Sequence, residues 1–359
     1  MKLLVKISPV LLLLVLFSCE KSSTIMYVGN WVQKSNFAGN GRSYASSFTI
    51  GNYGYVGLGY ISNPANGKDR LNDFYSYYQD SDRWTQVDSF PGMPRSSAVG
   101  IGTSTKGYII GGYSDNEFTA NGNDTVLNDV WQFDPSQAPG QHPNRQWTYM
   151  GLFPGQARYG AIGFCINDIC YFGTGMNADK SDLGDFWGYN PKSNTWTNLG
   201  NIEGSKRFYA TAFVIQNKGY LVTGMNNGVN INDFWQYNPT TNTWIKKNYI
   251  ANVQTATFDD LYTTIIREMS VSFVINGKGY VSTGLNGGMT NVTWEYDPVA
   301  DLWTRKTDFE GSLREGANAF SFGNNTAYVF NGQSGMLSYD DVWQFFPFSE
   351  YNPMQLLEN

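Results

Sequence analysis

The stretch Arg207-Phe-Tyr-Ala-Thr-Ala-Phe-Val-Ile215, followed by Gln216-Asn-Lys-Gly219 and Tyr220-Leu-Val-Thr-Gly224, decides the fold of this chain. After a polar loop the unit continues with Asn232-Asp-Phe-Trp-Gln-Tyr-Asn-Pro239 and ends with Thr243-Trp-Ile-Lys246. Four short runs rich in β-branched and aromatic residues alternate with Gly, Asn and Pro turns, which predicts four antiparallel strands. Because a single sheet of four strands leaves one face uncovered, this unit needs copies of itself as neighbours.

The same pattern occurs six times along the chain. Each copy begins its first strand with an arginine: Arg42, Arg95, Arg158, Arg207, Arg267 and Arg314. An aspartate heads the third strand in five copies: Asp73, Asp129, Asp185, Asp233 and Asp341. The fifth copy has Val292 at this position instead. The spacing of the arginines is close to the roughly 50 residues of one known class of β repeat.

The last strand of the repeat indicates how the array closes. Five copies contain a tryptophan there: Trp84, Trp147, Trp196, Trp244 and Trp303. The sixth copy ends at Pro347 without one, whereas Asn30-Trp-Val-Gln-Lys34 matches Thr243-Trp-Ile-Lys-Lys247. We therefore expect the N-terminal strand to complete the sixth copy and close a ring, which removes the exposed edges of an open row of sheets.

These units resemble the Kelch repeats of six-bladed β-propellers over residues 29–347. The resemblance implies an all-β fold with four antiparallel strands in each blade. The glycine pair of the family is intact only as Gly111-Gly112, and elsewhere its first member is replaced, at Thr174, Thr223, Thr283 and Asn331. The tail, residues 348–359, has no assignment.

The N-terminus has the pattern of an export signal. Two lysines precede a short apolar run that ends in Leu16-Phe-Ser-Cys19, and this run is too short for a membrane-spanning helix. The ending resembles the bacterial lipobox, which implies a signal peptide over residues 1–18, acylation of Cys19 and a tether over residues 19–28. We expect a lipid-anchored protein of the bacterial outer membrane, on its periplasmic or its outer face. The alternative is an ordinary signal peptide with a chance cysteine.

The composition limits the partners of this protein. Its net charge is −6, which argues against nucleic acid and against binding to anionic membrane surfaces. Aromatic residues make up 16% and charged residues only 15%, a balance that suits an all-β protein with broad aromatic surfaces. We expect a monomer that meets the membrane only through its lipid.

Cys165 and Cys170 flank the predicted turn Ile166-Asn-Asp-Ile169. A two-residue turn at Asn167-Asp168 would make them a non-hydrogen-bonded pair, whose close approach can accept a disulfide. In an oxidising compartment we expect this bond, with two free buried thiols as the alternative.

Most of the long connections are predicted on one face of the ring. They span residues 61–72, 114–128, 176–184 and 247–266, whereas residues 136–145 form a long connection on the other face. Insertions that gather on one face of a repeat protein usually mark its binding surface. Unconstrained drift of loops is the alternative explanation.

The six arginines are expected at the mouth of the central channel on this same face. They can bind an anionic ligand, or each can pair with an aspartate of the third strand. Since Val292 leaves Arg267 without such a partner, we expect a ligand-sized depression near Arg267 and Arg314. Glu268 and Glu315, which follow these arginines directly, complete the candidate site, and the long connection before it contributes Asp259 and Asp260.

The sequence excludes several chemistries and predicts no cofactor. His142 is the only histidine, so a copper site like that of galactose oxidase, a histidine-based triad and a zinc site cannot be assembled. The acidic loops at residues 114–117 and 179–185 do not follow the alternation of a calcium-binding EF-hand, so we predict no metal site.

Two classes of function remain. The first is a non-catalytic binding module that meets a protein or a glycan on the long-loop face, where Trp and Tyr suit sugar stacking. The second is a sugar-acid isomerase resembling the periplasmic Kelch mutarotase of N-acetylneuraminate. That resemblance implies an arginine on the sugar carboxylate and a carboxylate, Glu268 or Glu315, that transfers protons.

Overall fold

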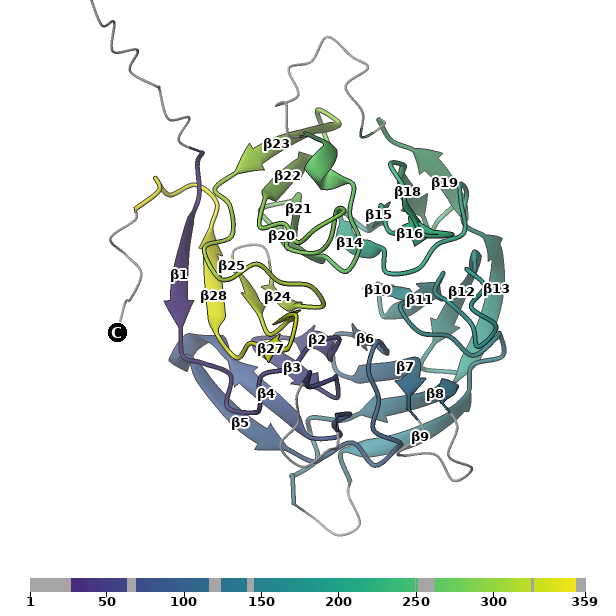
Figure 1. Ribbon diagram of the computed structural model, residues 1–359. Helices are drawn as coiled ribbons and strands as arrows, with labels where there is room; N and C mark the ends of the chain where they lie inside the picture. The colour runs from purple at the N-terminus through teal and green to yellow at the C-terminus, as the bar shows by residue number, and fades with distance from the viewer. Residues whose placement is uncertain are drawn as a thin grey trace, which may run out of the picture.

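The computed structural model is a ring of β-sheets around a central axis (Figure 1). It describes residues 27–62, 69–115, 124–140, 145–248, 250, 262–323 and 326–352. Among these residues there are six antiparallel sheets of four strands and two short two-stranded sheets. The predicted all-β fold, a six-bladed propeller, is confirmed. The predicted signal peptide, Cys19 and most of the tether lie outside the described residues.

The four strands of each blade come from one continuous segment of the chain, except in blade six, where the N-terminal strand joins the sheet. Blade one contains β2 (Ser46–Ile50), β3 (Tyr53–Gly57), β4 (Phe74–Tyr78) and β5 (Arg83–Val87). Blade two contains β6 (Val99–Gly102), β7 (Gly107–Ser114), β8 (Thr125–Phe133) and β9 (Trp147–Leu152). Blade three contains β10 (Ile162–Ile166), β11 (Ile169–Gly173), β12 (Asp185–Asn190) and β13 (Thr195–Asn201).

The second half of the ring follows the same order. Blade four contains β14 (Thr211–Ile215), β15 (Lys218–Val222), β18 (Phe234–Asn238) and β19 (Thr243–Lys246). Blade five contains β20 (Val271–Ile275), β21 (Lys278–Ser282), β22 (Thr293–Asp297) and β23 (Leu302–Lys306). Blade six contains β24 (Asn318–Phe322), β25 (Thr326–Phe330), β28 (Val342–Phe346) and β1 (Asn30–Lys34).

Small elements occupy some connections. Two hairpins follow the second strand of blades four and six: β16 (Met225–Asn226) with β17 (Val229–Asn230), and β26 (Gln333–Ser334) with β27 (Leu337–Ser338). Two 3₁₀ turns are η1 (Gln79–Ser81) and η3 (Tyr262–Ile265). In blade two, β7 and β8 extend into the region predicted as loop from residue 114 to 128. A register shift between Ile110 and Gly112 accompanies this extension.

The ring closes through the N-terminal strand, as predicted. β1 pairs antiparallel with β28, with Trp31 opposite Phe345. The indole of Trp31 is fully buried and meets Phe309 edge-on at 5.0 Å, and its Nε1 donates to the carbonyl of Thr307 at 3.3 Å. Both ends of the described chain therefore meet in blade six, where the closure removes a free sheet edge.

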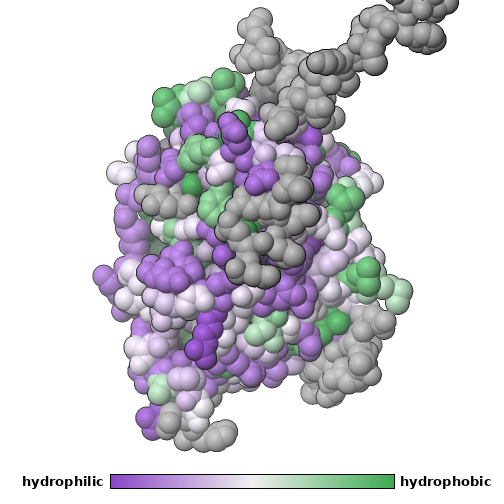
Figure 2. All heavy atoms as spheres, turned by 90° about the vertical axis from the view of Figure 1, so that its left-hand side faces the viewer, coloured by the Kyte–Doolittle hydropathy of each residue, from purple (hydrophilic) through white to green (hydrophobic). Residues whose placement is uncertain are grey.

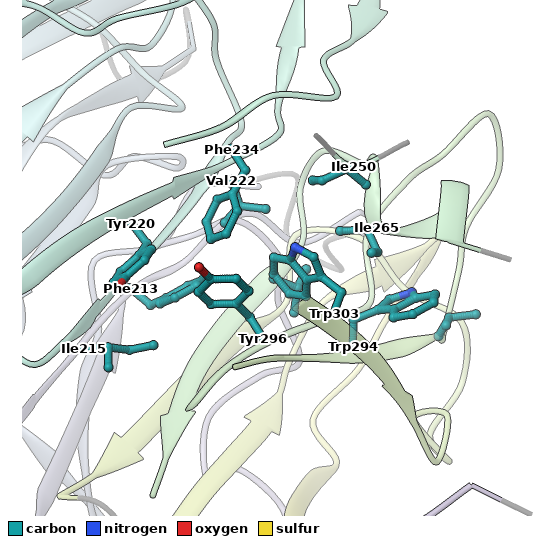
Figure 3. Packing of buried hydrophobic residues seen from close by; sticks show 12 residues of the cluster. Phe213, Ile215, Tyr220, Val222, Phe234, Ile250, Ile265, Trp294, Tyr296 and Trp303 are labelled. Atoms are coloured by element: carbon teal, nitrogen blue, oxygen red, sulfur yellow. The ribbon is translucent and has the colours of Figure 1, made fainter. Parts of the chain in front are cut away.

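The core lies between neighbouring blades. In the contact between blades four and five (Figure 3), Phe213 and Phe234 of blade four pack with Tyr296 and Trp303 of blade five. Phe234 and Tyr296 meet edge-to-face at 4.6 Å. This edge-to-face geometry places the positive edge of one ring against the negative face of the other.

One glycine explains how closely the blades approach. Gly279 of β21 lies against the ring of Phe213, and a Cβ atom there would come within 2.4 Å of that ring. Gly219 meets Phe164 of the preceding blade in the same way. The phenylalanine of one blade thus needs a small residue in the next, which is glycine in most blades and Ala327 opposite Phe273.

Cys170 occupies this position in blade three. Four blades have glycine there, and blade six has Ala327. Cys170 packs in one cluster with Ile101, which replaces the phenylalanine of blade two. Cys165 and Cys170 are opposite each other in the β10–β11 ladder, as the turn at Asn167 and Asp168 predicted. Both are free thiols in the structure, so the predicted disulfide is not formed in it. A cross-strand position brings two thiols together but does not itself join them, because the bond needs an oxidant.

A closed belt of backbone hydrogen bonds surrounds the channel. It is made by the residue two positions after each first-strand arginine: Tyr44, Ser97, Gly160, Tyr209, Met269 and Gly316. Each N–H donates to the carbonyl of the preceding member, at 2.8–3.2 Å, and the N–H of the first member donates to the carbonyl of the last, so the six bonds form a ring. All six residues have positive φ, between 49° and 59°.

A second set of inter-blade bonds explains the glycine pair. The N–H of its second member, such as Gly224, donates to the carbonyl of the next blade's arginine, here Arg267 at 3.0 Å. Gly224 has φ +95°, and a Cβ atom on it would come within 2.8 Å of Ala210. The first member, Thr223, has φ 54°, a left-handed conformation that residues other than glycine can adopt at some cost. This is why only the second glycine is retained in every copy.

The outside of the ring is polar. Figure 2 shows the side of the molecule that carries β1, where hydrophilic residues predominate and apolar ones form separate small patches. The outer strand β5 exposes alternate residues, with Trp84 half-buried. Isolated apolar residues of this kind are normal on a protein surface.

Candidate functional site

The first-strand arginines are structural in five blades. All six side chains are buried. In five of them the two Nη atoms meet both oxygens of the third-strand aspartate of the same blade, at 2.5–2.9 Å. The predicted arginine–aspartate pairing is confirmed. These bidentate pairs join the first and third strands of each blade.

Arg267 is the exception that Val292 predicts. Its Nη1 donates to the carbonyls of Thr283 and Val292, at 2.8 and 2.9 Å, and its Nε to the carbonyl of Thr264 at 2.6 Å. Its Nη2 has no hydrogen-bond partner among the described residues. Burial lowers the pKa of Arg267 to about 9, which leaves the guanidinium charged at neutral pH.

A second replacement in blade five compensates for the lost carboxylate. In blade two, Trp131 donates its Nε1 to Asp129 at 2.7 Å. In blade five the equivalent Trp294 donates instead to the Thr264 hydroxyl at 2.9 Å. Thr264 therefore replaces one hydrogen bond of the missing aspartate. No described carboxylate hydrogen-bonds to Arg267, although the charge of Asp308 acts on it from a distance.

Arg267 and Arg314 line neither of the two cavities described below. Arg314 is buried in its pair with Asp341, and Arg267 is buried within blade five. Ligand binding at these two arginines remains a prediction, and the described residues point to a different site.

The candidate site lies instead at the channel mouth, over blades one to four. We call it the mouth pocket, and it has a volume of about 240 Å³. It is lined by Tyr44, Tyr60, Arg70, Ser96, Ser97, Tyr113, Tyr159, Lys180 and Tyr209. A second cavity of about 240 Å³, the channel cavity, is lined by small residues of the six first strands together with Tyr44 and Tyr209.

Arg70 is the basic group best placed to bind a ligand in the mouth pocket. Its guanidinium lies over the rings of Tyr60 and Tyr113, at 4.5 and 5.5 Å, where the ring faces attract the cation. Asp69 and Asp115 lie within 3.2 and 3.7 Å of its Nη1. Its Nε and Nη1 donate to no oxygen among the described residues. Arg70 thus offers buried donors at the wall of an open pocket.

The tyrosines of the pocket are neutral donors. Burial, followed by the hydrogen bond to Asp124, raises the pKa of Tyr113 to about 12, and its hydroxyl donates to that carboxylate at 2.5 Å. Burial also raises the pKa of Tyr159, with Asp182 adding to the effect. The Tyr159 hydroxyl donates to the sulfur of Met176 at 3.0 Å. The pocket therefore combines aromatic faces with hydroxyls that stay protonated at neutral pH.

Glu268 and Glu315 lie together near the edge of this pocket. Burial raises the pKa of Glu268, and the charge of Glu315 raises it further. Oε2 of Glu268 has no partner among the described residues, whereas Oε1 of Glu315 accepts from Gln333 at 3.0 Å. Burial raises the pKa of Tyr44, which lines the pocket, and the charges of Glu315 and Glu268 raise it further. The structure thus brings together the two predicted carboxylates but separates them from the two predicted arginines.

Sequence reasoning missed Arg70 and the tyrosines. The sequence did contain one signal for the tyrosines. In each copy, the residue that follows the second-strand glycine pairs with the residue that follows the first-strand arginine. Ser43 pairs with Tyr60 in this way, and Ser96 pairs with Tyr113. Aligning these positions across the copies would have placed both tyrosines on one rim.

Two further findings concern the described residues. They include no helix long and apolar enough to cross a membrane. They also contain no group of three His, Cys, Asp or Glu side chains that could hold a metal ion. Asp259 and Asp260 lie outside them.

Comparison with known proteins agrees with the architecture. The Kelch motif matches residues 206–248. N-acetylneuraminate epimerase of Pasteurella multocida (strain Pm70) is 28% identical over 130 residues, 36% of this chain and 30% of the relative. The enzyme of the same name from Yersinia enterocolitica is 33% identical over 100 residues, 26% of this chain and 21% of the relative. The match thus spans less than a third of either relative.

A solved structure supports the fold over a longer range. The structure of YjhT superimposes with a TM-score of 0.68 and 16% identity, covering 86% of this chain and 96% of the other. At this identity the likeness concerns the fold alone. With the motif match and the closed ring of six four-stranded blades, this chain is a six-bladed β-propeller that carries a Kelch motif.

Proposed function

We propose that this protein binds an acidic glycan, or its terminal acidic sugar, in the mouth pocket. The observation that carries the proposal is Arg70, whose guanidinium is stacked on two tyrosines and has two donor atoms, Nε and Nη1, that make no hydrogen bond among the described residues. Its Nη1 lies 3.2 and 3.7 Å from Asp69 and Asp115, so a ligand carboxylate would share this atom with them. A carboxylate that reached it would form charge-assisted hydrogen bonds in a largely desolvated place. Lys180 at the same wall adds a second positive charge.

The remaining wall suits a hydroxylated ligand. Tyrosine faces pack against the apolar face of a sugar ring, and the hydroxyls of tyrosine and serine bond to its polar groups. The volume of about 240 Å³ is that of a small-molecule site rather than of a protein interface. This favours the glycan over the protein among the two ligand classes expected of a binding module.

A second candidate function is isomerisation of a sugar acid. Glu268 favours it, because it is a buried carboxylate with a raised pKa and an oxygen without a described partner. Such a group can act as a proton donor or acceptor in catalysis. The names of the two relatives point to the same chemistry. In this function Arg70 would hold the sugar carboxylate. Glu268 would exchange a proton with the anomeric hydroxyl or the ring oxygen while the ring C–O bond breaks and forms again.

We also propose the cellular setting predicted from the leader. Acylated Cys19 would hold a monomeric propeller at the bacterial outer membrane, with residues 19–28 as the tether. The described ring begins directly after this tether, at the strand that closes blade six.

The binding proposal is tested by calorimetry with N-acetylneuraminate, galacturonate and the neutral sugar galactose. We expect an acid to bind and galactose not to bind. Arg70→Gln should weaken binding of the acid by at least tenfold. Arg145→Gln, an exposed arginine in the connection on the opposite face, should leave it unchanged. Equal binding by the Arg70 variant and the parent protein would refute the proposal.

The isomerase is tested separately by NMR. Saturation transfer between the α and β anomers of N-acetylneuraminate measures their exchange in the presence of the protein. We expect faster exchange than in buffer, and Glu268→Gln should remove the acceleration while Arg145→Gln retains it. An exchange rate equal to that in buffer would leave binding as the function.

A further inference from the structure

Two tyrosines cross the channel between the mouth pocket and the channel cavity. From blade one to blade six, the belt residues are Tyr44, Ser97, Gly160, Tyr209, Met269 and Gly316. Tyrosine and glycine thus each occur twice, three blades apart. Tyr44 comes from blade one and Tyr209 from blade four, which are opposite in a ring of six. Their ring centroids are nevertheless only 5.8 Å apart.

Each tyrosine is held at its far end by another belt residue. The Tyr44 hydroxyl donates to the sulfur of Met269 in blade five at 3.3 Å. The Tyr209 hydroxyl lies 3.2 Å from the Ser97 hydroxyl in blade two. The two rings therefore reach over the axis in opposite directions, and each is anchored beyond it.

The two glycines of the belt make room for these rings. A Cβ atom on Gly316 would come within 2.8 Å of the Tyr44 ring, and one on Gly160 within 3.0 Å of the Tyr209 ring. Tyr44 and Tyr209 also have φ values of 53° and 49°, a conformation that is unfavourable for a bulky residue and is typically retained where a side chain has a role.

The same pair lines both cavities. Tyr44, Tyr209 and Ser97 belong to the wall of the mouth pocket and also to the wall of the channel cavity. The pair therefore lies between the two cavities. A ligand that enters from the long-loop face meets the two phenol rings before it can enter the channel.

We propose that Tyr44 and Tyr209 form the floor of the binding site and set the length of the ligand. This inference rests on the proposed function, since it concerns the same pocket. The floor supports one sugar unit from below and stops a longer chain from passing into the channel. The site then recognises a free acidic sugar or the terminal unit of a glycan, which enters from one side only.

The test compares an acid with its own linear trimer. The probes are N-acetylneuraminate with its α2,8-linked trimer, and galacturonate with its α1,4-linked trimer, measured by calorimetry. The floor is removed in the variant Tyr44→Gly/Tyr209→Gly, because glycine is the native residue at two other belt positions and keeps the backbone conformation. The control Tyr44→Phe/Tyr209→Phe keeps both rings and loses only the hydroxyls.

For the wild-type protein, and likewise for the phenylalanine control, we expect the affinity for the monomer and the affinity for the trimer to be equal within about threefold. The glycine variant should bind the monomer about fivefold or more weakly, since stacking on the rings is lost. Its ratio of trimer to monomer affinity should rise by a similar factor, because the two cavities become continuous. A thermal melt checks that the glycine variant is folded.

Two results would overturn the floor. The first is a glycine variant that melts like the wild type and binds both probes as the wild type does. The second is a wild-type protein that prefers the trimer by tenfold or more. In either case a loss of binding in Arg70→Gln still supports the proposed function. If no acid binds the wild-type protein, the proposed function and the floor fail together.

Discussion

Replacing Asp129 with valine should destabilise blade two strongly. The carboxylate accepts hydrogen bonds from both Nη atoms of Arg95, at 2.5 and 2.8 Å, and from Nε1 of Trp131 at 2.7 Å. Valine has nearly the shape of aspartate, so the main loss is electrostatic. An unpaired buried charge costs about 3–5 kcal/mol. Chemical denaturation should therefore show a loss of about 4 kcal/mol, which is roughly 8 °C in melting temperature.

The matched variant removes the charge that valine leaves unpaired. Arg95→Met/Asp129→Val replaces the ion pair by apolar groups, and its loss should be about 2 kcal/mol smaller than that of Asp129→Val alone. Blade five shows that the chain tolerates valine at this position when Trp294 has another partner. A loss below about 1 kcal/mol for Asp129→Val would refute the argument, as would a double variant less stable than the single one.

The same pair predicts a dependence of stability on pH. Burial acts to raise the pKa of Asp129, but the hydrogen bonds and the charge of Arg95 outweigh it and lower the pKa below its usual value. Since the pKa is lower in the folded state, the contribution of the pair is present above about pH 4 and is lost as the pH falls. Asp129→Val should therefore lose less stability than the wild type between pH 5 and about pH 3.

Three further predictions concern the ends of the chain and the cysteines. Cys19→Ala should leave the protein unacylated and in the soluble fraction, and a variant that stays with membranes after a high-salt wash would contradict this. Deletion of residues 29–34 exposes the edge of β28 and should cause aggregation or a much lower melting temperature, so a melt within a degree or two of the parent would exclude the closure as a source of stability. Export to an oxidising compartment should join Cys165 to Cys170, seen as the loss of two hydrogens by intact mass and absent in Cys165→Ser; two free thiols in the exported protein would be the opposite result.

The architecture was predictable because its determinants repeat. An arginine, a glycine, an aspartate and a tryptophan recur at similar spacing, and outside blade five the arginine has the same aspartate partner in each blade. Trp31 could be assigned to blade six because its surroundings in sequence match those of Trp244. Even the exception was visible, since Val292 predicts the missing partner of Arg267 and the structure confirms it.

The candidate site was less predictable because it depends on what does not repeat. Arg70 lies in the connection between the second and third strands of blade one. The length of this connection varies among the blades, so no alignment of copies points to Arg70. Tyr44 and Tyr209 resemble ordinary strand aromatics in sequence. Only the positive φ of the belt residues, and the glycines in the adjacent blades that make room for the two rings, reveal that they reach the axis. Glu268 was found because it is adjacent to a repeated arginine, but the arginine itself points into the blade.

The belt around the channel also limits how such a chain can change its number of repeats. Each belt residue is joined to two neighbours, and the six bonds leave no free end. An added or lost repeat would have to break the hydrogen bonds at its place in the belt and change the angle between all neighbouring blades. The width of the channel would change with it. The number of repeats in this ring can therefore change only by a complete repeat, and each such change alters the channel. The connections on the long-loop face, in contrast, can lengthen one residue at a time.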